Sequence, residues 1–185
     1  MKCINCDHAM TTKRENVPYT ALPGTVLIGV PVSRCSNCGE YEVAIPAIDE
    51  LNRVLAGTVI RKRSRLRGGE VRFLRSYLGY SGSDFAKLIG SDPATVSRWE
   101  SDKQPIGHHT DLLLRAMIAL DRKVDEYPIA AFAEINAKET KRPQYAFRPT
   151  AKKWKPTALV SPRGKRLGHK SQRANVASSR TLSAA

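Results

Sequence analysis

The sequence predicts an α+β protein: a small β-rich N-terminal domain, a linking helix, an all-α domain and a disordered basic C-terminal tail. Three patterns lead to this prediction. Apolar residues alternate early in the chain, they recur at helical spacing in its middle, and neither pattern survives in its last part, which is rich in Pro, Lys, Arg and Ser. We place the boundaries at residues 1–67, 68–137 and 138–185, because this length suffices for two small domains and a tail.

The β-rich domain is predicted to contain a strand, followed by the linking helix. Residues 25–32 alternate in the way of a strand that is covered on at least one face, with Val26, Ile28 and Val30 as the alternating positions. From Ala47 the apolar residues fall at helical spacing, and Pro46 stands at a favourable helix start. We therefore expect a helix from Ala47 to about Arg63. Basic residues and paired glycines in residues 64–69 indicate a hinge after it.

All four cysteines of the chain lie in two matched Cys-x-x-Cys pairs, Cys3 with Cys6 and Cys35 with Cys38. Two residues between thiolates let the backbone turn around one metal ion, and two such turns supply the four ligands of a closed tetrahedral zinc site. Gly39 follows the second pair, where a tight turn is needed. We therefore expect one structural Zn²⁺ ion with no open position for a substrate.

Two alternatives for the cysteines are structural disulfides and a redox-active pair. A cytosolic protein rarely keeps structural disulfides, and the βαβ pattern that accompanies a thioredoxin-like motif is missing from the sequence. The segment between the pairs is longer than the about 15 to 20 residues of common zinc ribbons, and a β-hairpin would fill it.

The charge of the chain predicts a polyanionic partner. The net charge is +14, and a field of that sign attracts phosphate backbones. Most of the excess lies after residue 138, whereas residues 68–137 are slightly acidic. No apolar run approaches the ~20 residues that cross a bilayer, and the residues after Met1 lack the apolar stretch of a secretory signal. We expect a cytoplasmic protein without a membrane anchor.

The segment from Gly82 to Lys103 has the residue types of a helix-turn-helix. Two short helices cross tightly when a small residue lies at their contact, a glycine forms the turn and a branched apolar residue fixes the crossing. Ala86, Gly90 and Val96 have these types at these spacings. We expect the first helix at residues 83–89, and a second helix that is capped by residues 91–93.

The exposed face of that second helix is the predicted DNA-binding face. Val96 and Trp99 should point to the core, so the opposite face carries Arg98, whose guanidinium can bind O6 and N7 of a guanine and contribute ~1–3 kcal/mol of discrimination. Short side chains beside it would contact a thymine methyl, a base or a phosphate, and a lysine after the helix would contact the DNA backbone. The predicted DNA-binding set is Ala94, Thr95, Ser97, Arg98 and Lys103. The alternative is a helical bundle with no ligand, in which Arg98 is a solvated surface charge.

Residues 74–103, and Thr95-Val-Ser-Arg-Trp-Glu100 in particular, resemble the phage-repressor (Xre/Cro) type of helix-turn-helix. In that family an arginine near the end of the first helix pairs with the glutamate that closes the recognition helix. The resemblance therefore implies a structural ion pair between Arg75 and Glu100. The sequence departs from the family at Gly82 and Ala94, where many relatives carry a glutamine that contacts a base.

Over residues 1 to about 125 the chain resembles the MqsA (YgiT-type zinc finger) antitoxins. The resemblance depends on the Met-Lys-Cys-x-x-Cys start, the Pro18-Tyr19-Thr20 segment, the second cysteine pair, the linking helix and the repressor-type domain. It implies zinc ligation by the four cysteines and a recognition-helix arginine at Arg98, while the neighbouring asparagine of the family is replaced by Ala94. It also implies a ribonuclease toxin as partner, dimerisation through the helical domain and repression of the protein's own operon at a palindrome in double-stranded DNA.

Two other functions are alternatives to this antitoxin hypothesis. A stand-alone transcription factor would use the zinc domain only as a structural or dimerisation unit. An enzyme would need a carboxylate pair, a phosphate-binding glycine loop or a base beside a nucleophile, and the sequence offers none of these, so we expect no enzymatic activity. A two-fold interface would use the exposed part of an apolar helix containing Leu112, Leu113, Ala116, Met117 and Leu120. The basic tail either contacts phosphates or is a solvated segment without a role.

Overall fold

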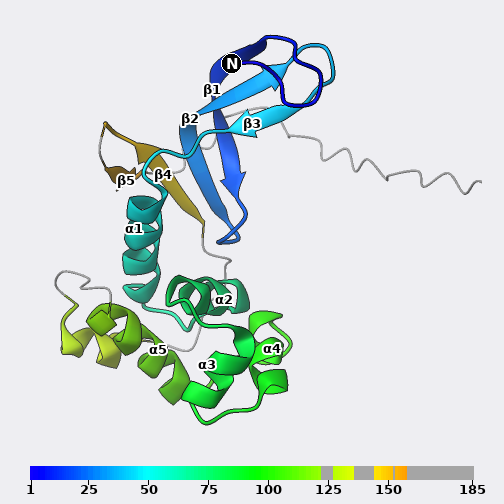
Figure 1. The fold of residues 1–185 in the computed structure, drawn as a ribbon. Coiled ribbons are helices and arrows are strands. Elements are labelled where there is room, and N and C mark those ends of the chain that lie inside the picture. The colour runs from blue at the N-terminus through cyan, green and yellow to red at the C-terminus, as the bar shows by residue number, and fades with distance from the viewer. Residues whose placement is uncertain (122–126, 136–143, 152, 158–185) are drawn as a thin grey trace, which may run out of the picture.

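The computed structural model describes residues 1–121, 127–135, 144–151 and 153–157. They form a mixed α/β structure in which helix α1 links a β-sheet to a group of helices (Figure 1). The coarse prediction of sheet first and helices afterwards is therefore confirmed. The elements in chain order are β1 (Met10–Tyr19), β2 (Thr25–Cys35), β3 (Tyr41–Val43), α1 (Ile48–Ile60), α2 (Gly68–Tyr77), α3 (Gly82–Leu88), α4 (Pro93–Glu100), α5 (His108–Asp121), the 3₁₀ helix η1 (Ile129–Glu134), β4 (Tyr145–Pro149) and β5 (Trp154–Pro156).

Strand β2 is the centre of a five-stranded sheet with the order β1-β2-β4-β5, and β3 also pairs with β2. Strands β1 and β3 run antiparallel to β2, whereas β4 pairs with the beginning of β2 in parallel. Strands β1 and β2 form the hairpin that fills the segment between the two cysteine pairs. This hairpin brings both pairs to the same end of the sheet.

The alternation of buried residues along β2 differs from the predicted one. Leu27, Val30 and Val32 are fully buried, so the buried positions change phase between Leu27 and Val30. The β1–β2 register is irregular between Glu15 and Val17. At this position Gly29 has a φ of 69°, and its N–H donates to the side chain of Asn16. A bulge of this kind moves the following residues to the other face, which a strict period-two pattern misses.

Helix α1 packs one face against the core and ends earlier than the sequence predicted. Its buried residues are Leu51, Leu55, Ala56, Gly57, Val59 and Ile60. These join the same apolar core as buried residues of the sheet and of helices α2 to α5. The two halves of the chain thus share one core, with α1 between them (Figure 1).

The expected hinge after α1 is instead held in place by a buried arginine. Arg115 of α5 is fully buried and pairs with Asp111 at 2.5 Å. Asp111 in turn accepts a hydrogen bond from the N–H of Leu66. The guanidinium also donates to the main-chain oxygens of Ile60, Lys62 and Ser64. Of the hinge expected at residues 64–69, the main-chain groups of Ser64 and Leu66 are hydrogen-bonded to α5, and Gly68 and Gly69 form the first turn of α2.

The prediction of a disordered tail is wrong for residues 144–151 and 153–157. Strand β4 pairs with β2, and β5 pairs back onto β4. Phe147 and Trp154 are buried, and the indole N–H of Trp154 donates to the carbonyl oxygen of Pro46 at 2.8 Å. Two buried aromatic side chains stabilise this short hairpin despite its high content of proline and basic residues. The part of the predicted tail after residue 157 lies outside the described residues.

No helix in the described part of the chain is both long and apolar enough to cross a membrane.

Candidate metal centre and candidate nucleic-acid interface

The two cysteine pairs lie in loops with the same backbone pattern. In the first loop the N–H of Asp7 donates to the oxygen of Cys3, and in the second the N–H of Gly39 donates to the oxygen of Cys35. Asp7 and Gly39 each follow the second cysteine of a pair, and both have a left-handed backbone, with φ of 57° and 76°. The sequence pointed to Gly39 but gave no sign of Asp7, because a glycine is the usual residue for this conformation.

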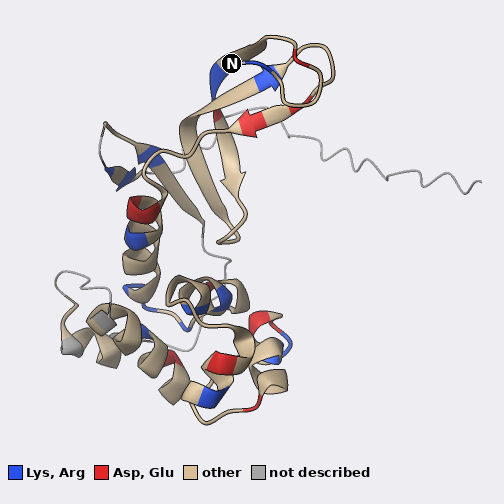
Figure 2. Cartoon of the chain, in the orientation of Figure 1, with Lys and Arg blue, Asp and Glu red and all other residues tan. Residues whose placement is uncertain are grey.

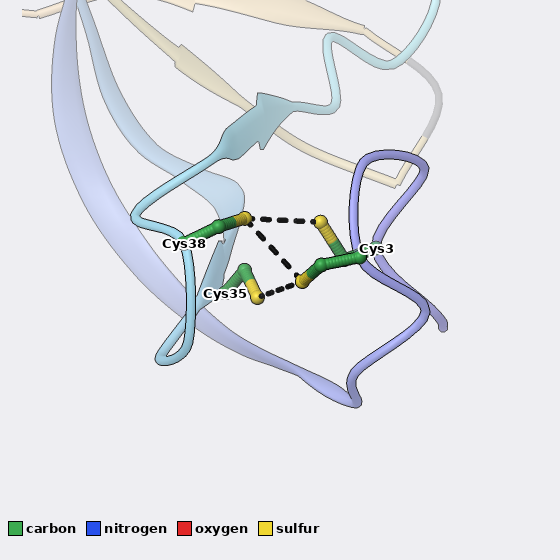
Figure 3. A group of neighbouring side chains, drawn as sticks. Cys3, Cys35 and Cys38 are labelled. Atoms are coloured by element: carbon green, nitrogen blue, oxygen red, sulfur yellow. Dashed lines mark hydrogen bonds between the residues drawn. The ribbon is translucent and has the colours of Figure 1, made fainter.

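The four sulfur atoms converge on one point between these loops. Sγ of Cys6 lies 3.4 Å from that of Cys35 and 3.5 Å from that of Cys38, and Sγ of Cys3 lies 3.5 Å from that of Cys38. All four ligand atoms lie within 4.8 Å of one another. Figure 3 shows the labelled Cys3, Cys35 and Cys38 directed toward a common centre, with dashed lines between the sulfur atoms.

These distances fit a shared metal ion and exclude a disulfide. A tetrahedral ion with bonds of about 2.3 Å to sulfur separates its ligands by about 3.8 Å, whereas the sulfur atoms of a disulfide lie about 2.05 Å apart. All four cysteines are free thiols. The arrangement is therefore compatible with a single structural metal site in which every ligand is a cysteine.

The thiols of Cys6 and Cys38 have opposite pKa shifts. The backbone hydrogen bond from His8 and the side-chain hydrogen bond from Asn37 lower the pKa of Cys6 to about 6. At Cys38 the backbone hydrogen bond from Glu40 lowers the pKa, but hydrogen bonds with Cys6 and Cys3 and burial outweigh it and raise the pKa to about 12. Thiolates this close repel one another, so a bound cation would be needed to ionise all four.

His8 is exposed and is not one of the converging ligands. Its Nδ1 lies 3.0 Å from the carbonyl oxygen of Cys6, and the group of described residues that could hold a metal ion contains the four cysteines and not His8. The hydrogen bonds to Cys6, first the backbone and then the side-chain contact, raise the pKa of His8. Its imidazole therefore contacts the first cysteine loop from outside.

Helices α3 and α4 are short and are joined by a tight turn. Ser81 caps α3 by accepting from the N–H of Asp84 at 3.1 Å, and Asp92 caps α4 by accepting from the N–H of Ala94 at 3.1 Å. Gly90 has a φ of 64° in the turn between them. The first helix thus begins one residue before the predicted position, and the Pro93 start of α4 matches the prediction.

The side chains of α4 divide into a buried face and an exposed face. Val96 and Trp99 are buried in the core, as predicted. Thr95 is half-buried, and the other members of the predicted DNA-binding set are exposed: Ala94, Ser97, Arg98 and Lys103. The structure therefore brings Ala94, Thr95, Ser97 and Arg98 together on one helix, while Lys103 lies beyond its end.

The Arg75–Glu100 pair implied by the repressor resemblance is present. Nε of Arg75 lies 2.5 Å from Oε1 of Glu100, and its Nη2 lies 3.2 Å from Oε2. The side chains are 13% and 7% exposed. Arg72 approaches the same carboxylate from the solvent side at 3.3 Å. This pair ties α2 to the end of α4 and so fixes the orientation of the exposed α4 face.

Sequence reasoning missed Gln104, which lies beside Arg98. Its Oε1 accepts a hydrogen bond of 3.3 Å from Nε of Arg98. Nη2 of the same guanidinium donates to Oγ1 of Thr95 at 2.6 Å. Gln104 lies after the end of the helix, so helical spacing could not predict that it contacts Arg98.

Helix α5 carries exposed apolar side chains. Leu113 is 46% exposed and Leu120 is 81% exposed. They lie seven residues apart, which places them on the same helix face. Met117 lies between them and is only partly buried.

Comparison of the chain with protein-family models gives no match, and a search of curated proteins gives none either. The functional interpretation therefore depends on the geometry of the chain's own residues and on the motif resemblances described above.

Proposed function

We propose that this protein is a zinc-stabilised, DNA-binding transcriptional repressor that acts as the antitoxin of a type II toxin–antitoxin pair. It neutralises a ribonuclease toxin and represses its own operon. The DNA-binding part of the proposal depends on the exposed face of α4, which includes Arg98. The Arg75–Glu100 pair and the burial of Val96 and Trp99 hold this helix in place.

Zinc is the metal that best fits the cysteine cluster. Four thiolates in a closed tetrahedral set are the ligands of structural zinc sites. Bound zinc would cross-link the two loops and stabilise the end of the β1–β2 hairpin. Since protein sulfur fills every position, the ion contributes folding free energy and no substrate chemistry.

Base contacts of α4, rather than bulk charge, would direct DNA binding. Figure 2 shows acidic as well as basic residues along helices α2 to α5. Arg98 offers a bidentate contact to guanine, worth ~1–3 kcal/mol per site. One contact of this size gives little specificity alone, which favours a dimer on two half-sites of a palindrome.

A homodimer formed through α5 would provide the two α4 helices that two half-sites require. Leu113 and Leu120 expose an apolar stripe on this helix. A two-fold interface places the same surface of both copies in contact, so one such stripe is enough to build it. The interface would also set the separation of the two α4 helices.

The toxin partner is the part of the proposal that depends on the antitoxin resemblance. The alternative is a stand-alone transcription factor in which the metal centre only stabilises the fold. Both functions require operator binding, but only the antitoxin requires a small toxin gene beside this one. Co-expression of the two genes tests the difference: co-purification in a stable complex supports the antitoxin, and separate elution supports the stand-alone factor.

The DNA-binding part is tested by footprinting on the DNA upstream of the protein's own gene. We expect the wild-type protein to protect a palindromic segment, and the Arg98→Ala variant to lose this protection while it keeps its fold. Uniform weak binding along the fragment by both proteins would contradict sequence-specific recognition.

A further inference from the structure

The guanidinium of Arg98 is held between two neighbouring side chains on the exposed surface of α4. Nη2 donates to Oγ1 of Thr95 at 2.6 Å, and Nε donates to Oε1 of Gln104 at 3.3 Å. Thr95 lies three residues before Arg98 and therefore on the same face of the helix. The two acceptors bind different nitrogens of one planar group, so together they restrict its rotation.

Gln104 reaches this position because the chain turns back at the end of α4. Asp102 has a left-handed backbone with a φ of 56°. After this turn the N–H groups of Lys103 and Gln104 both donate to the carbonyl oxygen of Arg98, at 3.0 and 3.2 Å. The backbone of Gln104 is thus fixed to the residue whose side chain it contacts.

A contact with helix α2 holds the turn itself. Oδ1 of Asp102 accepts a hydrogen bond of 2.7 Å from the N–H of Gly68, the first residue of α2. The Arg75–Glu100 pair also joins α2 to the last residue of α4. The position of Gln104 therefore follows from hydrogen bonds of its own backbone and of the turn before it.

The two internal hydrogen bonds leave a defined set of donors on Arg98. A guanidinium has five N–H donors in a fixed plane, and among the described residues the side chain of Arg98 donates to Thr95 and Gln104. Both N–H groups of Nη1 and one of Nη2 then remain for a ligand. One N–H of Nη1 and the remaining N–H of Nη2 form a pair of parallel donors, which matches O6 and N7 of guanine.

Holding Arg98 in this way lowers the entropy cost of the contact, because a long side chain that is already oriented loses less rotamer freedom on binding. We infer that Thr95 and Gln104 are positioning residues that orient the guanidinium of Arg98 toward a guanine, and that Thr95 acts through Arg98 and makes no DNA contact of its own. The inference rests on the proposed DNA-binding function and replaces the direct contact expected for Thr95.

A matched pair of variants separates these two roles of Thr95. Thr95→Val removes the hydroxyl at nearly constant volume, whereas Thr95→Ser keeps it. A direct phosphate contact would contribute equally to specific and non-specific binding, because phosphate contacts carry no sequence information. A positioning role affects only the guanine contact. Gln104→Met tests the second acceptor in the same way.

The probe is the DNA segment upstream of the gene that the wild-type protein protects, made with guanine or with 7-deazaguanine, which lacks N7. We expect the wild type and Thr95→Ser to bind the 7-deazaguanine duplex about tenfold more weakly, as for ~1.4 kcal/mol of lost discrimination. For Thr95→Val and Gln104→Met the ratio of the dissociation constants for the 7-deazaguanine and guanine duplexes should fall below about threefold. Their affinity for a random duplex should be unchanged. If Thr95→Val still binds the 7-deazaguanine duplex tenfold more weakly than the guanine duplex, the inference is overturned. An equal loss of affinity of Thr95→Val for the guanine, 7-deazaguanine and random duplexes also overturns it.

A second measurement uses the protein without DNA. Relaxation of the Nε–H group of Arg98 by NMR should show a rigid group in the wild type and in Thr95→Ser, and a mobile one in Thr95→Val. Equal mobility in all three overturns the positioning role even when operator binding is intact. Conversely, a rigid Arg98 in a wild-type protein that binds every duplex equally overturns the proposed DNA recognition, and the guanine-directed role with it.

Discussion

The hydroxyl of Tyr145 in β4 donates a hydrogen bond of 2.6 Å to Oε1 of Glu70 in α2. The carboxylate of Glu70 is buried, and its other oxygen accepts from Nζ of Lys62 at 2.6 Å and from the N–H of Arg67 at 2.8 Å. A residue from the C-terminal part of the chain thereby completes the hydrogen bonding of a buried charge at the start of the helical part.

Replacing Tyr145 by phenylalanine should destabilise the protein by about 1.5 to 3 kcal/mol, because a hydrogen bond to a buried charged group is lost while the ring is kept. The measurement is urea unfolding followed by circular dichroism. Tyr41→Phe is the control, since Tyr41 is 57% exposed. Equal midpoints for the two variants would contradict the role given to Tyr145.

Truncation tests the contribution of the β4–β5 hairpin to stability. A chain that ends at residue 157 keeps every described residue and is the reference. A chain that ends at residue 143 loses the buried Phe147 and Trp154, and burial of a single large aromatic side chain contributes ~3–5 kcal/mol. The shorter chain should therefore be much less stable. Coinciding unfolding curves would show that the β4–β5 hairpin does not belong to the core.

Two glycines provide a test of the contact between α2 and α4. A Cβ atom on Gly68 would collide with the main-chain oxygen of Trp99 and lie 2.6 Å from that of Glu100, whereas a Cβ atom on Gly82 meets nothing within 4 Å. Gly68→Ala should cost about 1 to 3 kcal/mol, since the backbone of both helices must shift. Gly82→Ala should be neutral or stabilising by about 0.4 to 1 kcal/mol. Thermal unfolding that ranks the two variants in the opposite order would contradict this packing.

The cysteine cluster should bind one zinc ion per chain, and a strong chelator should destabilise the sheet. Metal content is measured by atomic absorption, and local stability by hydrogen exchange of the β1 and β2 amides. Cys35→Ser should lose the metal, because a closed site needs all four ligands. His8→Ala should retain it, since His8 contacts Cys6 from outside the site. Metal loss in both variants would show that His8 is a ligand, contrary to the geometry.

The sequence predicted features that depend on local patterns. Paired cysteines, helix caps and the i, i+3 spacing of Val96 and Trp99 each reflect interactions within a few residues, and the structure has them at or near the expected positions. The Arg75–Glu100 contact is long-range, but the resemblance to the phage-repressor motif predicted it. Local signals were therefore sufficient for the four converging cysteines and for the exposed face of α4.

The features that the sequence did not predict depend on contacts between distant segments. Strand β4 pairs with β2 across more than a hundred residues of chain, and Arg115 binds main-chain oxygens of the segment after α1 from another helix. The phase of β2 changes at Gly29 through a bulge opposite Asn16. Periodicity carries no information about these partners, which is why it predicted neither the β4–β5 strands, nor the Arg115 contacts of residues 60–66, nor the phase of β2.

The most direct test of the account is the ratio of dissociation constants for the protected upstream palindrome and a scrambled duplex, measured at one fixed salt concentration with the wild-type protein and with Arg98→Ala. We predict that the wild type prefers the palindrome by at least a thousandfold, the lower end of the range for specific DNA-binding proteins. Arg98→Ala should reduce this preference by about thirtyfold or more, since two half-sites each lose a guanine contact worth ~1–3 kcal/mol, together at least ~2 kcal/mol, with little change on the scrambled duplex. An identical ratio for both proteins, or no preference in the wild type, would contradict recognition of DNA by the α4 face.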